Sequence, residues 1–195
     1  MHPRVTELQC IMPIGNVPSV MQHGILSYER AARLTHHSVA MPEIQDKRDQ
    51  KHVPGRLKLH QYANLYFHAR NPMMYRRLAE VDRLCVLRVA TAVLDSQGTV
   101  ITDQNAASDY VRFLAPTQWS LLDFDDIFAM DWRHPGDPPA YYRHRSRKCA
   151  EVLVPHRIQP ARILGAYVVD QAAAQRLTAV GFTLPIAVEP VLFFR

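Results

Sequence analysis

The sequence predicts an α+β fold in which helices flank a mixed, mainly antiparallel central sheet. Apolar, β-branched runs typical of strands mingle with helical patterns, but without the regular strand–helix–strand rhythm of a doubly wound parallel sheet. The chain has 195 residues, 48% of them hydrophobic, which suffices for one domain with a full core. Because we find no repeat, low-complexity tract or linker, we expect residues 1–195 to form a single domain.

The first half of the chain predicts two strands and two helices. Val5–Met12 is a short apolar stretch that favours a strand. Asn16 is a good N-cap for the helix that follows, and Gly24 is placed to end that helix. Leu59–Phe67 is mostly apolar and indicates a second strand. A helix is expected over Pro72–Asp82, because proline suits the first helical position.

The elements of the second half of the chain are predicted from the same kinds of pattern. Leu84–Leu94 is apolar and β-branched, and it predicts a strand. Asp103 or Asn105 can cap a helix over Ala106–Phe113. Further strands are expected at Val100–Thr102, Cys149–Val154, Ile163–Val169 and Ile186–Phe194, and further helices at Phe124–Met130, Ala140–Lys148 and Gln171–Val180.

Composition limits the classes of function. A formal net charge of +5 favours an anionic partner. The three cysteines, Cys10, Cys85 and Cys149, are widely spaced and odd in number, which argues against disulfides or a zinc ribbon and fits a reducing cytoplasm. No signal peptide or apolar stretch of ~20 residues is present, so we expect a cytoplasmic protein without a membrane partner. None of the ten histidines has metal-ligand spacing, and we expect no metal.

Two charged side chains are candidates for chemistry. Glu151 is the only charge in an apolar strand, and it either faces solvent or supports an oxocarbenium-like transition state from inside a cleft. Arg48 lies in the charged run Gln45–His52, a helical turn or loop, where it either belongs to a solvated face or forks onto a diphosphate. No Walker A, GxGxxG or GxSxG motif is present, which weakens kinase, dehydrogenase and hydrolase interpretations.

The segment Leu59–Tyr75, LHQYANLYFHARNPMMY, is the most informative in the chain. It is either a core strand with its exit turn or a strand that brings a flat aromatic surface and an arginine to one cleft. The second arrangement would suit a nucleotide-like ligand. The basic stretch Arg143–Lys148, just before Glu151, is either a solvated helix face or an edge that contacts phosphates.

Taken in order, these segments resemble the DarT family of DNA ADP-ribosyltransferases. The resemblance runs from about Leu8 to about Val169. Its motifs are MPIGNVPSV at Met12–Val20, GILS at Gly24–Ser27, IQDKR at Ile44–Arg48, the LHQYANLYFHARNPMMY segment, TDQNAASDY at Thr102–Tyr110 and KCAEVLVP at Lys148–Pro155.

The resemblance implies an ADP-ribosyltransferase-like fold and a reaction. Such enzymes cleave NAD+ at the nicotinamide–ribose bond, transfer ADP-ribose to a base in single-stranded DNA, and act as toxins that a macrodomain antitoxin neutralises. RNA or protein remains an alternative acceptor. Glu151 matches the catalytic glutamate that orients the ribose, and Arg48 matches an arginine that contacts phosphate and assists deprotonation of the base. A guanidinium holds its proton up to pH ~12, which makes its charge the more secure contribution.

The resemblance also implies which residues line the site. NAD+ is expected against Gln9, Cys10, Ile11, Met12, Ser19, Ser27, Arg48, Tyr66 and Arg70. Single-stranded DNA is expected against Met73, Tyr75, Asn105, Arg145 and Lys148, with Asn105 at a position where some members carry histidine. We further expect phosphate contacts from Lys47, Lys51, Arg145 and Lys148, and bases stacking on Tyr66 and Tyr75.

One departure from the family concerns the first strand. Members usually carry a histidine next to NAD+, where this chain has Gln9 and Cys10, and either residue can be its counterpart. A Gln9 amide could bind a ribose hydroxyl, and backbone groups of Cys10–Met12 could bind the nicotinamide amide. A nucleic-acid-binding module with weakened catalysis is the alternative that this departure motivates.

Overall fold

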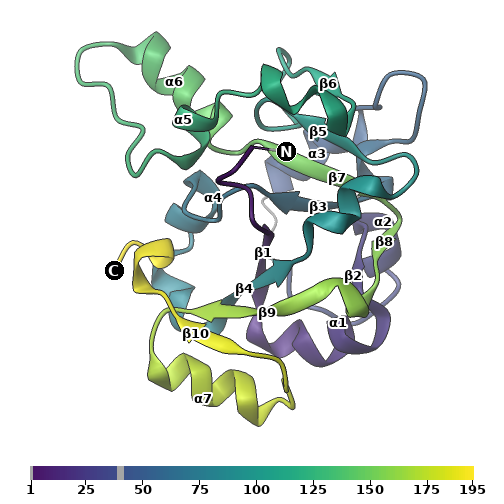
Figure 1. The fold of residues 1–195 in the computed structure, drawn as a ribbon, viewed down its shortest axis with the longest axis vertical. Helices are drawn as coiled ribbons and strands as arrows, with labels where there is room; N and C mark the ends of the chain where they lie inside the picture. Colours follow the sequence, from purple (N-terminus) through teal and green to yellow (C-terminus); the bar gives the residue numbers. More distant parts are fainter. Residues whose placement is uncertain (1, 39–41) are drawn as a thin grey trace.

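An eight-stranded sheet forms the centre of the molecule (Figure 1). The computed structural model describes residues 2–38 and 42–195. Strand order in the sheet is β10-β9-β4-β1-β3-β7-β5-β6. The strands are β1 Leu8–Pro13, β3 Tyr62–Tyr66, β4 Leu84–Val89, β5 Val100–Thr102, β6 Phe113–Leu114, β7 Glu151–Pro155, β9 Ile163–Val168 and β10 Ile186–Val188, and the short β2 Ile25–Leu26 and β8 Arg157–Ile158 pair separately.

Helices surround this sheet and vary from four to ten residues in length. They are α1 Val17–His23, α2 Tyr28–Ala31, α3 Pro42–Asp49, α4 Pro72–Tyr75, α5 Phe124–Phe128, α6 Pro138–Arg147 and α7 Gln171–Ala179. Within the described residues, β9 and β10 form a parallel pair and the other strand pairs are antiparallel. The prediction of an α+β fold with a mixed, mainly antiparallel sheet is confirmed.

The central strands are apolar because the sheet is covered there on both faces. In β4, Leu84, Cys85, Val86 and Leu87 are at most 1% exposed. Such burial on both faces explains a continuous β-branched run rather than an alternating one. None of the helices in the described part of the chain combines the length and hydrophobicity that a bilayer span requires.

The pairing of strands in the sheet is nearly interrupted between β1 and β3. On one side β1 pairs with β4 over six residues, from Leu8 to Pro13. On the other side its register with β3 contains one pair, Gln9 with Tyr66. β3 in turn pairs with β7 over five residues, the last of which joins Tyr66 to Glu151. The two strands therefore diverge after Gln9, and residues of β1 beyond that point face a cavity described below.

Several expected elements are shorter than their apolar runs suggest. The run at Leu59–Phe67 begins with a 3₁₀ turn, Leu59–Gln61, before β3. The helix expected at Pro72–Asp82 stops at Tyr75 and continues as a separate 3₁₀ turn, Leu78–Arg83.

Two further strands are shorter than predicted. β4 ends at Val89, and the rest of its apolar run forms a 3₁₀ turn at Thr91–Asp95. β10 ends at Val188, shortly before Pro190, which cannot donate to a ladder and begins a 3₁₀ turn at Pro190–Phe193.

The helix predicted over Ala106–Phe113 is wrong. Turns occupy this segment, and its end forms β6. The side chain of Asn105 accepts a hydrogen bond from the Ala107 N–H at 2.8 Å, which closes a local turn. The carbonyls of Ala107 and Ser108 accept from the ammonium of Lys51 at 3.0 and 2.5 Å. A distant side chain thus holds the carbonyls that a helix would have used.

Candidate active site

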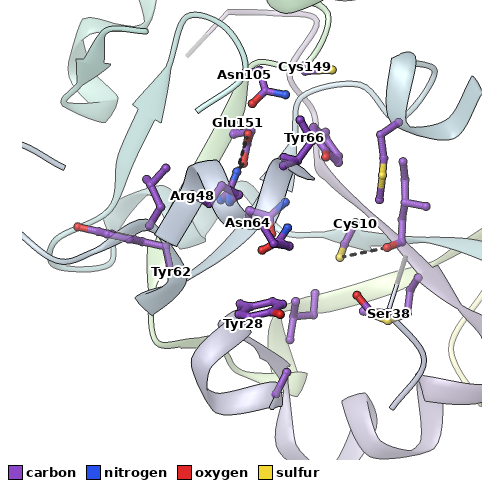
Figure 2. A pocket seen from close by; sticks show the side chains of 18 of the residues that line it. Cys10, Tyr28, Ser38, Arg48, Tyr62, Asn64, Tyr66, Asn105, Cys149 and Glu151 are labelled. Carbon is purple, nitrogen blue, oxygen red and sulfur yellow. Dashed lines mark hydrogen bonds and ion pairs between the residues drawn. The ribbon is translucent and has the colours of Figure 1, made fainter. Parts of the chain in front are cut away.

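A cavity opens where β1 and β3 diverge, and Figure 2 shows the side chains that surround it. Its lining includes residues of β1, β2, α2, α3, β3, the start of α4, the end of α6 and the start of β7. Nine of the residues predicted from the sequence lie in this lining: Cys10, Ile11, Met12, Arg48, Tyr66, Met73, Asn105, Arg145 and Glu151. Segments that are far apart along the chain therefore meet at one site.

Arg48 and Glu151 form a buried ion pair at this cavity. Nη1 of Arg48 lies 3.1 Å from Oε1 and 3.0 Å from Oε2 of Glu151. Arg48 is 7% exposed and Glu151 is 1% exposed. These exposures rule out both solvent-facing alternatives that the sequence left open. Because each charge has lost most of its hydration, the two groups depend on each other for compensation.

Two further hydrogen bonds fix Glu151. The backbone N–H of Ala106 donates to Oε1 at 3.0 Å. The backbone N–H of Glu151 donates to the hydroxyl of Thr102 at 2.9 Å, and that hydroxyl donates in turn to the carbonyl of Gln104 at 2.7 Å. A carboxylate offers about four acceptor positions, so these contacts leave capacity for a ligand hydroxyl.

Tyrosine rings also line the cavity that holds this ion pair. Tyr28, Tyr62 and Tyr66 line the cavity together with Asn64 (Figure 2). Burial raises the pKa of the Tyr66 hydroxyl well above its usual value, and the nearby Glu151 charge raises that pKa further. Tyr66 therefore keeps its proton and can donate a hydrogen bond beside the carboxylate.

The structure separates the two residues that could replace the family's histidine. Cys10 lines the cavity, and burial raises the pKa of its thiol to about 12, so the thiol stays neutral. Gln9 lies outside the cavity lining. Its amide oxygen accepts from the Ala69 N–H at 2.7 Å, and its amide nitrogen donates to Glu7 at 3.3 Å. The hydrogen bonds of Gln9 thus hold the chain after β3, and the assignment of Gln9 to a ligand contact stays a prediction.

A segment missed by the sequence prediction, His36–Ser38, also lines the cavity. The side chain of Asn16 binds it through both amide atoms: Nδ2 donates to the His37 carbonyl at 2.7 Å, and Oδ1 accepts from the His37 N–H at 3.0 Å. Asn16 thus precedes α1 as predicted but does not cap it through its side chain. Nothing in the sequence near His37 signals this pairing.

Lys148 does not reach the cavity. It is 1% exposed, and its ammonium donates to the carbonyls of Ile127 and Ala129 at 2.8 and 2.7 Å and lies 3.2 Å from Nδ1 of His68. Burial lowers the pKa of Lys148 to about 8, and burial together with this ammonium lowers the pKa of His68 to about 3. The predicted phosphate contact of Lys148 is corrected, because its donors are used inside the protein.

Arg70 and Tyr75 lie on a neighbouring surface and not in the cavity lining. The Arg70 guanidinium donates to the carbonyls of Met130 and Val191 and stacks 4.0 Å from the ring of Phe194. Tyr75 is 54% exposed and packs edge-on against the same ring. The structure thus places Arg70, which was expected at NAD+, outside the cavity lining, where its guanidinium holds the C-terminal segment.

The two serines expected at the ligand also lie outside the cavity lining. Ser27 is 1% exposed, and its hydroxyl accepts from the Arg30 N–H as the N-cap of α2. Ser19 is a half-buried residue inside α1. In the described part of the chain, no group of three or more His, Cys, Asp or Glu side chains is placed to hold a metal ion.

Comparison with known proteins shows which family the chain belongs to. The model of the family described as ssDNA thymidine ADP-ribosyltransferase, DarT, matches residues 10–194. The chain belongs to the DarT family. A DNA ADP-ribosyl transferase–DNA ADP-ribosyl glycohydrolase fusion protein of Thermosipho africanus is 29% identical over all of this chain and 51% of the fusion. The chain thus spans about half the length of that relative.

Solved DarT structures share the fold. The Thermosipho africanus DarTG structure in complex with ADP-ribose superimposes with a TM-score of 0.82 at 28% identity, covering 96% of this chain and 51% of the other. The Thermus sp. 2.9 DarT structure in complex with ADP-ribosylated ssDNA gives a TM-score of 0.85 at 22% identity, covering 99% and 98%. The predicted membership of the DarT family is confirmed.

Proposed function

We propose that this DarT-family chain is an NAD+-dependent ADP-ribosyltransferase that modifies a thymidine base in single-stranded DNA and releases nicotinamide. The observation that carries the proposal is the buried Arg48–Glu151 pair in the cavity. The family description supplies single-stranded DNA and thymidine as the acceptor. We also propose that residues 1–195 act as one catalytic domain in the cytoplasm.

In the proposed reaction, the bond between nicotinamide nitrogen and ribose C1′ breaks. The bonding electrons leave with nicotinamide, so positive charge develops on the ribose ring. The Glu151 carboxylate stabilises this oxocarbenium-like sugar and accepts a hydrogen bond from a ribose hydroxyl. A nitrogen of the base then forms the new bond to C1′, and its proton passes to solvent water. Burial of Glu151 strengthens the effect, because few water molecules screen its charge.

Arg48 contributes a positive charge and hydrogen-bond donors to the proposed reaction. Its Nη1 contacts Glu151, and the rest of the guanidinium can fork onto the diphosphate. A guanidinium is a poor proton acceptor. We therefore assign to Arg48 the stabilisation of the deprotonated base through its positive charge, and do not assign to it removal of the proton.

The cavity lining suggests how the two substrates are arranged. NAD+ lies along Cys10, Ile11 and Met12 on the edge of β1 that has no β3 partner beyond Gln9. DNA approaches from the side of Met73, Asn105 and Arg145. Tyr75 lies close by in sequence and is exposed enough to stack on a base outside the cavity.

We propose a toxin role and a macrodomain-type ADP-ribosyl glycohydrolase as the antitoxin partner. The support is the Thermosipho africanus relative, which joins a transferase to a DNA ADP-ribosyl glycohydrolase in one chain. Expression of this chain alone should arrest growth of a host cell, and co-expression of such a glycohydrolase should restore growth. Growth arrest that persists with an active glycohydrolase would contradict this partner.

The activity is tested with NAD+ labelled in the ADP-ribose part. The purified chain and its Glu151→Gln variant are incubated with separate pools of single-stranded DNA, duplex DNA, RNA and protein. We expect label on thymidine-containing single-stranded DNA, with an equal amount of nicotinamide released, and no label with the variant. Label on RNA or protein alone would favour the alternative acceptor. Absence of both label and nicotinamide release would favour a binding module with weakened catalysis.

A further inference from the structure

The carboxylate of Glu151 is held from two sides by segments outside its own strand. Arg48 reaches it from α3, and the Ala106 N–H reaches it from the turns after β5. Figure 2 shows Glu151 with Arg48 on one side and Asn105, the neighbour of Ala106, on the other. The carboxylate keeps one orientation only while these two segments keep a fixed separation.

Lys51 connects the two segments. Its backbone N–H donates to the carbonyl of Arg48 at 3.1 Å, just beyond the end of α3. Its ammonium crosses to the other segment, where it donates to the carbonyls of Ala107 at 3.0 Å and Ser108 at 2.5 Å. Lys51 is therefore hydrogen-bonded to the backbone of both segments that hold Glu151.

The carbonyl contacts are the stronger part of this connection. The Lys51 side chain is 23% exposed, and hydrogen bonds from a partly buried ammonium are charge-assisted. The ammonium also lies 3.1 Å from a carboxylate oxygen of Asp109, whose side chain is 86% exposed. Water screens such an exposed ion pair, so it contributes little.

The turns at 106–109 are held by local hydrogen bonds, such as that from the Ser108 N–H to the Asn105 carbonyl at 2.9 Å, and by this outside cation. No helix or strand organises these residues. Within the segment, the side chain of Asn105 closes one turn by accepting from the Ala107 N–H. The next two carbonyls are held by Lys51 instead. Loss of the ammonium would leave the Ala107 carbonyl to water and the Ser108 carbonyl with only the Val111 N–H, at 3.4 Å. The backbone that presents the Ala106 N–H would then be held less firmly.

We propose that Lys51 is a positioning residue for ADP-ribosyl transfer. It holds the Ala106 N–H opposite Arg48, so that the Glu151 carboxylate faces the ribose in one orientation. Lys51 is absent from the cavity lining and acts through these groups without touching the reacting atoms. This inference rests on the proposed function above. It also replaces the expectation that Lys51 contacts a DNA phosphate.

Three variants distinguish a positioning role of Lys51 from a contact with a DNA phosphate. Lys51→Met keeps the length of the side chain without its charge, and Lys51→Arg keeps a cationic donor. Asp109→Asn is the matched control, because it removes only the exposed ion pair. For each variant we would measure the single-turnover rate of transfer, the affinity for NAD+, the salt dependence of single-stranded DNA binding, and amide exchange in residues 103–112.

We expect Lys51→Met to lower the rate of transfer by about 10- to 100-fold, the effect of a small misplacement of a catalytic group. Affinity for NAD+ and the salt dependence of DNA binding should change by less than about twofold, because Lys51 touches neither substrate. Amide exchange should become faster at 103–112 and stay unchanged in α7. Lys51→Arg should recover most of the rate, and Asp109→Asn should behave like the parent chain.

An unchanged rate in Lys51→Met would overturn the proposal. Weaker DNA binding with a smaller salt dependence would also overturn it and return Lys51 to a phosphate contact. If the parent chain transfers no label to any acceptor, the proposed function fails. Faster exchange at 103–112 in Lys51→Met would still establish the connection in that case. Unchanged exchange together with an active parent chain would reject the role of Lys51 alone.

Discussion

Glu151 takes both of its contacts with Arg48 from a single nitrogen, Nη1, at 3.1 and 3.0 Å. Most arginine–carboxylate pairs that fix geometry use two nitrogens in parallel. Here, among the residues that the structure describes, the contacts of the Arg48 guanidinium use Nη1, and Nε and Nη2 can bind a second anion. The pair therefore places a carboxylate and a guanidinium at one point of the cavity.

The first prediction concerns Glu151→Gln. This variant keeps the size of the side chain and its acceptor for the Ala106 N–H but removes the negative charge. Transfer should fall by at least about 100-fold, because the developing positive charge on the ribose loses its stabilisation. Single-turnover kinetics measure the rate, and circular dichroism checks that the domain stays folded. Activity within about tenfold of the parent chain would show that Glu151 is structural.

The second prediction compares Arg48→Met with Arg48→Lys. Arg48→Met leaves the Glu151 carboxylate buried and unpaired, so the free energy of unfolding should fall by about 3–5 kcal/mol. Arg48→Lys keeps a charge near Glu151 and should lose less stability, but it lacks the fork for the diphosphate and should raise the KM for NAD+. Urea unfolding and steady-state kinetics measure the two effects.

A double variant provides the control for this comparison. Arg48→Met combined with Glu151→Gln removes both charges, and it should be more stable than Arg48→Met alone. Equal stability of the single and double variants would mean that the two charges are not coupled in solution.

The third prediction concerns Asn16, whose amide binds both peptide groups of His37. Asn16→Ala should raise the KM for NAD+ several-fold, because the His36–Ser38 segment would no longer be held at the cavity. Asn16→Asp keeps the acceptor but loses the donor, and it should give an intermediate value. Isothermal titration with NAD+ measures the affinity directly. An unaltered NAD+ affinity in both variants would show that this segment holds its place without Asn16.

The fourth prediction distinguishes Gln9 from Cys10. Gln9→Ala should lower the melting temperature with little change in KM, because its amide holds Ala69 and Glu7 and does not face the cavity. Cys10→His should increase the rate of transfer, since an imidazole can bind a ribose hydroxyl where the neutral thiol binds poorly. The reverse result, with kinetics sensitive to Gln9 only, would place the family's histidine position at Gln9.

The fifth prediction is a pH dependence of stability caused by Lys148. Burial lowers the pKa of this ammonium from 10.5 to about 8. Between these values the unfolded chain binds a proton that the native chain has lost, so the free energy of unfolding should rise with pH by on the order of 3 kcal/mol. Below about pH 8 Lys148 is charged in both states, and its contribution becomes constant.

Lys148→Met tests this dependence. Urea unfolding of both chains at about pH 7 and about pH 10 gives the difference in stability between them at each pH. That difference should move in favour of the parent chain at the higher pH. Parallel pH profiles would mean that the ammonium is not desolvated.

Much of the fold could be predicted because burial leaves a clear pattern. The apolar runs that became β4 and β7 are buried along most of their length, and their existence follows from the sequence pattern. The ends of elements could not be predicted in this way. Ala106–Phe113 has the composition of a helix, yet its carbonyls bind Lys51, which lies more than fifty residues earlier in the chain.

The site could be predicted only in part. The resemblance to a family identified Glu151 and Arg48, whereas the pattern around each residue favoured a solvated face. A basic side chain near a helix end gives no sign of whether it points outward or inward, so the buried position of Lys148 could not be predicted. Asn16 was interpreted through its local capping preference, but its partner His37 is a long-range contact that no local rule contains.

The divergence of β1 from β3 has a consequence for how such sequences can vary. The nucleotide can take the hydrogen bonds that a neighbouring strand would otherwise supply. In that case backbone N–H and C=O groups of β1, and not its side chains, bind the nucleotide. Substitutions along Cys10–Met12 then alter catalytic efficiency more readily than ligand capture. Family members can therefore vary in sequence at this strand, lose the usual histidine, and still bind NAD+.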